Sequence, residues 1–185
     1  MGILRGGINE VIATTAFNAA PIGIHYREKK FHAFLFLGSH TAENIARDGW
    51  VVANLVHDPV MYVKTAFSDL PKEMFIEEPV NGKTMHRLAG ADGWAAFSAT
   101  VEHRTDTAMT VSLKPELERI EEVVVYPVNR GFNSLIDATV HATRYTITRD
   151  PELRKHIDYH AGIVRKCGGK NELEALEMLR GYIGQ

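Results

Sequence analysis

The apolar residues of this chain change their spacing about two thirds of the way along, and this change restricts the folds that it can adopt. Up to about residue 129 they come in short β-branched or aromatic runs separated by turn-forming residues, a pattern typical of strands. From about residue 131 they recur at helical spacing. Strands followed by helices predict an α+β fold with a small barrel or sandwich, rather than a sheet wound from βαβ units.

The turn and cap residues set the expected elements. The strand-like stretches are residues 10–17, 21–28, 31–38, 50–56, 94–105 and 121–129. A short helix over residues 42–48 ends at Gly49, and residues 69–93 are expected to form long connections with short helical pieces. Three helices are expected in the last third: one over residues 131–146, one beginning at Asp150-Pro151, and one with a capping box of Asn171 and Glu174.

Composition and charge exclude several classes of function. The 185 residues carry 21 Lys and Arg against 23 Asp and Glu, with no block of like charges, which argues against nucleic acid or an anionic membrane as the main partner. The single cysteine, Cys167, excludes an intrachain disulfide and fits a reducing, cytoplasmic setting. No apolar run approaches the ~20 residues of a membrane span, and residues 1–17 lack the order of a signal peptide.

The stretch GSHTAENIARDGWVVANL, residues 38–55, places several polar side chains at the start of the short helix. Thr41 can cap the helix and Asn44 can reach back to it, while an acidic residue in the first turn suits the helix dipole. The same region can instead bind a terminal phosphate, because the free N–H groups of a helix start, with Ser39 and His40 beside them, form an anion site. Both interpretations stay open on the local sequence.

A second stretch, TTAFNAAPIGI over residues 14–24, joins two expected strands through Asn18, two alanines and Pro21. Its small side chains would let a flat ring approach the backbone, whose N–H and C=O groups could bind the polar edge of that ring. The alternative is an ordinary turn that contains asparagine and proline.

In combination, NAAPIGI and the following GSHTAENIARDGWVVANL resemble the FMN-binding split-barrel superfamily of flavin reductases and pyridoxamine-phosphate oxidases. The chain is most similar to an uncharacterised prokaryotic branch, in which a helical region with a segment like NRGFN...IDATVHATR follows the barrel. The resemblance implies a six-stranded antiparallel split β-barrel over residues 1–130, and a helical region over residues 131–185 that packs on it. It also implies a homodimer with FMN at the subunit interface.

The resemblance carries over the following cofactor-binding residues, all by position. Those along the isoalloxazine ring and ribityl chain would be Thr14, Thr15, Asn18, Ala19, Ala20, Pro21 and Ile22, those at the phosphate would be Ser39, His40, Thr41 and Asn44, and Asn54 would lie on a strand beside the flavin. Relatives often place Arg or Lys near the phosphate, whereas this loop has only His40. A further charge is therefore expected from Lys64, from Arg130 or from the second subunit.

The implied function is that of a flavin-dependent oxidoreductase whose FMN does the redox chemistry, with NAD(P)H or another small redox substrate as partner. No catalytic side chain is assigned. The alternative is a non-catalytic FMN-binding or assembly module in cofactor metabolism. An amphipathic stripe over residues 171–183 could serve such a module, or could pack on the chain's own barrel.

Other constellations are weaker. His156 and His160 stand four residues apart, as in helical zinc sites, but Ile157 lies where a zinc protease carries its catalytic Glu and no third ligand is evident, so no metal is predicted. Asp137, His141 and Arg144 form one polar stripe of a helix, which is more often a solvated face than a catalytic set.

Overall fold

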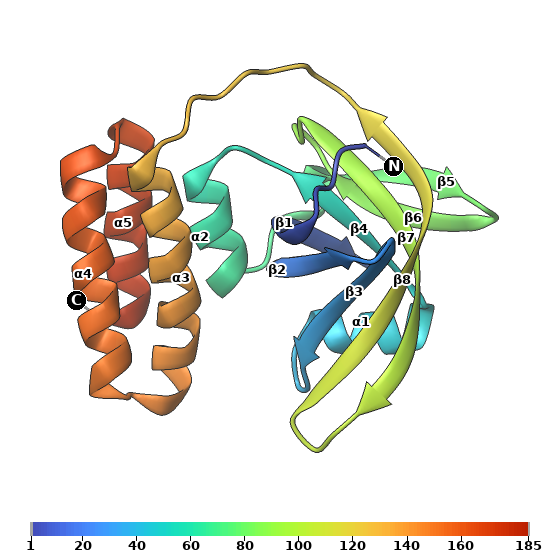
Figure 1. The fold of residues 1–185 in the computed structure, drawn as a ribbon, viewed down its shortest axis with the longest axis horizontal. Coiled ribbons are helices and arrows are strands. Elements are labelled where there is room, and N and C mark those ends of the chain that lie inside the picture. The colour runs from blue at the N-terminus through green and yellow to red at the C-terminus, as the bar shows by residue number, and fades with distance from the viewer. Residues whose placement is uncertain (1, 185) are drawn as a thin grey trace. The chain divides into compact units, whose positions relative to one another are not determined.

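The computed structural model describes residues 2–184, which form two compact units (Figure 1). One unit consists of Met1–Val56 and Asp69–Val124, and the other of His57–Ser68 and Val125–Gln185. The sequence predicts helical structure of the second unit only after residue 130. The contribution of residues 57–68 to that unit is therefore a finding of the structure.

Within residues 2–184, six strands of the first unit form a closed antiparallel barrel in the order β1-β2-β3-β8-β7-β4. The strands are β1 (Gly7–Thr15), β2 (Asn18–Arg27), β3 (Lys30–Phe36), β4 (Trp50–Leu55), β7 (Gly93–Arg104) and β8 (Ala108–Ile120). The predicted six-stranded antiparallel barrel is confirmed. The barrel closes where β1 pairs with β4, over the short register from Ile12↔Asn54 to Thr14↔Val52.

The last barrel strand differs from the one that the sequence predicts. The predicted strand 121–129 lies outside the strands of the described chain, and the last barrel strand is β8. Strand β8 is hard to recognise because it carries Pro115 and several charged residues, and the β7–β8 register shifts between Phe97↔Pro115 and Ala96↔Leu117. A bulge of this kind is where a strand tolerates proline.

Alternate residues of the barrel strands point inward and form its core. The buried members include Val11, Ala13, Ile24, Phe31, Ala33, Leu35, Val51, Ala53, Ala95, Phe97, Met109, Val111 and Leu113. Helix α1 (His40–Asp48) contributes Ala42 and Ile45 to the same core. Its N-cap is Ser39, whose side chain accepts a hydrogen bond from the N–H of Ala42, so the expected cap at Thr41 is wrong by two residues.

A hairpin of β5 (Phe75–Val80) and β6 (Lys83–Leu88), preceded by the 3-10 helix η1 (Lys72–Met74), occupies the region expected to be connections. It packs on the outward face of β4 and β7, where its residues share a cluster made of Trp50, Val52, Val80, Met85, Trp94 and Ala96. The hairpin turns at Asn81-Gly82, both at positive φ, as Asn-Gly turns commonly do. The Lys83 ammonium donates to the carbonyls of Asp48 and Gly49, which end α1.

The second unit is made of α2 (Pro59–Phe67), α3 (Arg130–Thr148), α4 (Pro151–Cys167) and α5 (Lys170–Ile183). One apolar core joins them, and it includes Val63, Leu135, Ala138, Ala142, Ile157, Ala161, Val164, Leu176 and Leu179. The chain approaches itself closely at Gly131, where a Cβ atom would lie 2.5 Å from the backbone of Gly168. In the described chain, no helix is long and apolar enough to cross a membrane.

The helix caps of this unit follow the sequence in part. Asp150 accepts a hydrogen bond from the N–H of Glu152 and precedes proline, as predicted. The predicted capping box of Asn171 and Glu174 is wrong: the N-cap of α5 is Gly169, whose N–H donates to the Glu172 carboxylate at 2.8 Å, and glycine has no side chain to return the bond.

Candidate functional site

The stretches 14–24 and 38–55 meet at the turn between β1 and β2, which lies beside the start of α1. The Asn44 side-chain amide donates to the Thr15 hydroxyl at 2.9 Å. The Asn18 amide donates to the Thr41 hydroxyl, also at 2.9 Å. Four of the predicted cofactor-binding residues are thus brought together by two side-chain pairs, one on each side of the hairpin turn.

The start of α1 keeps polar groups available beyond its own needs. Ser39 alone caps the helix, and its hydroxyl donates to the carbonyl of Phe36. Ser39 and His40 are exposed, whereas Asn18 and Asn44 are half-buried. Each asparagine uses one amide hydrogen in the ties to the hairpin, and a side-chain amide carries a second hydrogen and a carbonyl oxygen as well.

The predicted ring-binding segment, Asn18 to Ile22, alternates between the two faces of β2. Register places Ala19 opposite Thr14 and Pro21 opposite Ile12, on the outward face of the barrel. Ala20 and Ile22 point inward, so that only their backbone could reach a ligand outside the barrel. The outward row continues to Gly23, which gives β2 a run of small outward residues.

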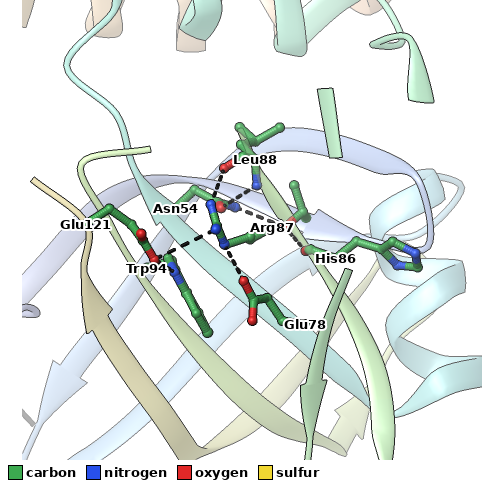
Figure 2. Close-up of polar contacts among 8 residues, drawn as sticks. Asn54, Glu78, His86, Arg87, Leu88, Trp94 and Glu121 are labelled. Carbon is green, nitrogen blue, oxygen red and sulfur yellow. Dashed lines mark hydrogen bonds and ion pairs between the residues drawn. The ribbon is translucent and has the colours of Figure 1, made fainter. Parts of the chain in front are cut away.

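Thr14 and Asn54 lie in a fully buried network that joins three strands, and Figure 2 shows Asn54 next to Leu88. The Asn54 amide donates to the carbonyl of Ile12 at 2.8 Å and to the Thr14 hydroxyl at 2.9 Å, and its carbonyl accepts from the N–H of Leu88 at 2.8 Å. The Thr14 hydroxyl in turn donates to the carbonyl of His86 at 2.5 Å. These two side chains therefore fasten β1, β4 and β6 to one another, and we leave them out of the cofactor contacts.

An ion-pair network next to Asn54 was not evident in the sequence (Figure 2). The Arg87 guanidinium donates to the Glu78 carboxylate at 2.7 Å and lies 3.8 Å from the Glu121 carboxylate, which also accepts from the Trp94 indole at 2.8 Å. Because these groups come from β5, β6, β7 and the residue after β8, the network secures the hairpin on the barrel. Only the fold brings them together.

His86 is a second group that the sequence did not reveal. Its ring is 4.2 Å from that of Phe17 and 5.8 Å from that of Trp50, and its buried Nδ1 has no hydrogen-bond partner within residues 2–184. Burial lowers the pKa of His86, opposed by the Glu77 carboxylate 3.9 Å from its Nε2, so the imidazole is neutral at pH 7. Figure 2 shows the ring directed away from the Arg87 network.

A lysine side chain lies against the ring of Phe17, which is in the turn between β1 and β2. Phe17 has φ 51°, unusual for an aromatic residue, and its ring is partly exposed. The ammonium of Lys72 lies 5.1 Å from the centre of this ring. Lys72 is therefore a cation of the barrel unit close to the turn between Thr15 and Asn18.

Lys72 was not predicted from the sequence, and the two cations that were, Lys64 and Arg130, belong to the helical unit. Arg130 is the exposed first residue of α3, and Lys64 is half-buried on α2. The N-terminal N–H groups of α3 at Gly131 and Phe132 already bond to the Asn129 side chain. Neither cation is assigned to the barrel site.

Comparison with known proteins gives matches over most of the chain. The family model described as "Protein of unknown function (DUF447) N-terminal domain" matches residues 9–122, and that described as "Protein of unknown function (DUF447)" matches residues 129–181. An uncharacterised protein of Methanocaldococcus jannaschii, MJ1453, is 26% identical over 192 residues, which cover 93% of this chain and 96% of that protein.

The solved structures with a similar fold include a member of the same family and a nitroreductase. The crystal structure of the FMN-bound protein MM1853 from Methanosarcina mazei, of the same DUF447 family, is 35% identical with a TM-score of 0.91, over 96% of each chain. The 2-nitrobenzoate 2-nitroreductase NbaA of Pseudomonas fluorescens is 14% identical with a TM-score of 0.51, over 65% of this chain and 68% of that one, a likeness of fold alone. The predicted FMN-binding split-barrel fold is confirmed.

We predict that Asn54→Ala destabilises the protein by about 2–4 kcal/mol, because it removes the side-chain acceptor of the buried Leu88 N–H and a side-chain donor to the Ile12 carbonyl, and opens a cavity. The measurement is urea unfolding followed by circular dichroism. Asn133→Ala, at an exposed position of α3, is the control and should change the free energy of unfolding by less than ~0.5 kcal/mol. Equal stability of the two variants would contradict the role given to Asn54.

Proposed function

Because this chain belongs to the DUF447 family, of which the M. mazei member was crystallised with FMN, we propose that it binds FMN at the β1–β2 hairpin and α1 and uses it as an oxidoreductase. The observation that carries the proposal is the convergence of Thr15, Asn18, Thr41 and Asn44 at one place. These residues come from the two stretches on which the family resemblance rests.

The groups at the start of α1 fit a phosphate. The helix has nine residues, and its first N–H groups with the exposed Ser39 hydroxyl and His40 imidazole provide donors to an anion. The second amide hydrogens of Asn18 and Asn44 can add to this set. We propose that Lys72, which lies beside the hairpin turn, is the cation of the barrel unit that pairs with the phosphate.

The outward face of β2 fits a flat ring. Pro21 of this face is half-buried and stands between the buried Ala19 and the half-buried Gly23, which carry little or no side chain, so a planar isoalloxazine could lie close to the backbone at Pro21. When bound, FMN supplies the two-electron redox chemistry. The chain's part is then to position the ring, to hydrogen-bond its polar edge and to exclude water from one face.

The same outward face also carries exposed apolar residues, which favour its burial against a second copy of the chain. Ile8 is 55% exposed, Phe34 57% and Phe36 67%, and the rings of His25 and His32 lie 5.1 and 5.4 Å from that of Phe34. Exposed aromatic clusters of this kind usually mark interaction sites. We therefore place the homodimer interface on β1, β2 and β3, next to the proposed ring site.

We expect the chain to bind FMN saturably, one per subunit, and much more tightly than riboflavin, as followed by flavin fluorescence. Thr41→Ala combined with Asn44→Ala should weaken FMN binding about tenfold or more, because hydrogen bonds that hold the charged group are lost. Thr100→Ala, an exposed threonine of β7, is the matched control. An unchanged FMN affinity in the double variant would refute the phosphate assignment.

Catalytic turnover separates an oxidoreductase from a passive FMN-binding or assembly module. We expect the FMN-loaded protein to oxidise NADH or NADPH faster than the sum of free FMN and apoprotein, measured by loss of nicotinamide absorbance in air. Tight FMN binding with no added turnover for either nicotinamide, or for other small reductants, would favour the non-catalytic alternative.

We expect Phe34→Glu to convert the dimer into a monomer, halving the mass measured by light scattering, because the variant places a charge in an apolar contact. Ile76→Glu, at an exposed position of β5, should leave the mass unchanged. If both variants stay dimeric, the interface lies elsewhere on the chain.

A further inference from the structure

The helical unit contains a cluster of three histidines that the sequence divides between two helices. His141 lies on α3, and His156 and His160 lie one turn apart on α4. The ring centre of His141 is 4.9 Å from that of His156 and 5.8 Å from that of His160. The fold thus supplies the third imidazole that the sequence did not indicate.

Two nitrogens of this cluster are buried without a partner. His141 Nδ1 and His160 Nδ1 have no hydrogen bond in the described part of the chain. Buried polar atoms of proteins are nearly always satisfied, and an exception calls for a bound water or ion as its explanation. A single species bound between the two neighbouring rings would satisfy both.

A carboxylate of α3 stands at a distance suited to the same bound species. Asp137 Oδ2 lies 3.9 Å from His160 Nδ1, which is too far for a hydrogen bond. Two ligand atoms on one tetrahedral zinc, each ~2.0–2.1 Å from the metal, lie roughly 3.4 Å apart. A small shift would therefore let Asp137 and His160 coordinate one ion between them.

The spacing of the rings leads to the same conclusion. With metal–nitrogen bonds of ~2.0–2.1 Å, two imidazoles on one tetrahedral ion have ring centres roughly 5 Å apart. The distances of 4.9 and 5.8 Å are close to this value. We propose that His141, His156, His160 and Asp137 bind one divalent ion of the zinc type between α3 and α4.

The imidazole rings of the three histidines would rotate when the metal binds. As the side chains lie, no three His, Cys, Asp or Glu within residues 2–184 are arranged to hold an ion, and the imidazoles stack with interplanar angles of 20° and 27°. Rotation about the last side-chain bond turns a stacked imidazole so that its nitrogen faces the ion. His156 is exposed and the Asp137 side chain is 62% exposed, which gives an ion a way in from solvent.

Four protein ligands make this a structural site, because a catalytic zinc keeps one position open for water or substrate. The ion would join the first helix of the C-terminal region to the second and so stabilise the helical unit. The site is independent of the proposed FMN function, because its ligands all belong to α3 and α4.

The test is calorimetric titration of the untagged full chain, stripped with EDTA and free of flavin, with ZnCl2. We expect one Zn²⁺ per chain, and at least a tenfold rise in the dissociation constant for His141→Gln and for His156→Gln. His103→Gln, an exposed histidine of β7, is the matched control and should bind as the unsubstituted chain does. His156→Gln keeps the test valid even if the His141 variant fails to fold, since His156 is exposed.

Cobalt gives a second measurement. Co²⁺ at the site should produce the visible absorption of a tetrahedral ion, and Zn²⁺ should displace it. The proposal is overturned if Zn²⁺ does not bind saturably, if His156→Gln binds as tightly as the unsubstituted chain, or if His103→Gln loses binding to the same degree. Water would then be what satisfies the two buried nitrogens.

Discussion

The barrel depends on one buried asparagine in its shortest strand pairing, where β1 meets β4. β1 and β4 pair over only a few residues, and Asn54 lies within that seam and bonds to β1 and to β6 at once. A side-chain amide can donate and accept together, so it can replace the ladder bonds that the short register lacks. The β1–β2 hairpin, which carries Thr15 and Asn18 of the proposed site, follows directly after this β1–β4 pairing. The Asn54 amide also donates to the hydroxyl of Thr14, the neighbour of Thr15.

The site residues predicted from the sequence divide according to what each can reach. Asn18, Thr41, Thr15 and Asn44 stand in two short stretches whose local order suits a ligand, and the fold brings those stretches together, which supports the proposal that they bind FMN. Asn54 has the same chemistry, but its partners are far away in the chain. Whether a polar residue serves a ligand or the fold is decided by these distant partners, which local sequence does not contain.

The same limit explains the elements that the sequence missed. Strand β8 was obscured by Pro115 and its charges, which the chain accommodates at a bulge paired with β7. The β5–β6 hairpin is short and polar on one side, and its strand character depends on the cluster that it covers. By contrast, β1 to β4 and the three C-terminal helices have periodic patterns or strong caps, and were predictable for that reason.

Helix α2 has a consequence for how the chain can be made and divided. Val63 is completely buried in a core whose other helices begin only at Arg130, after the whole β5–β8 part of the barrel unit has been made. During synthesis α2 leaves the ribosome before those helices are made. Its apolar face therefore stays exposed, or bound by another protein, until they have been synthesised. For the same reason, a fragment cut between residues 122 and 129 would separate the C-terminal helices from the helix that completes their core.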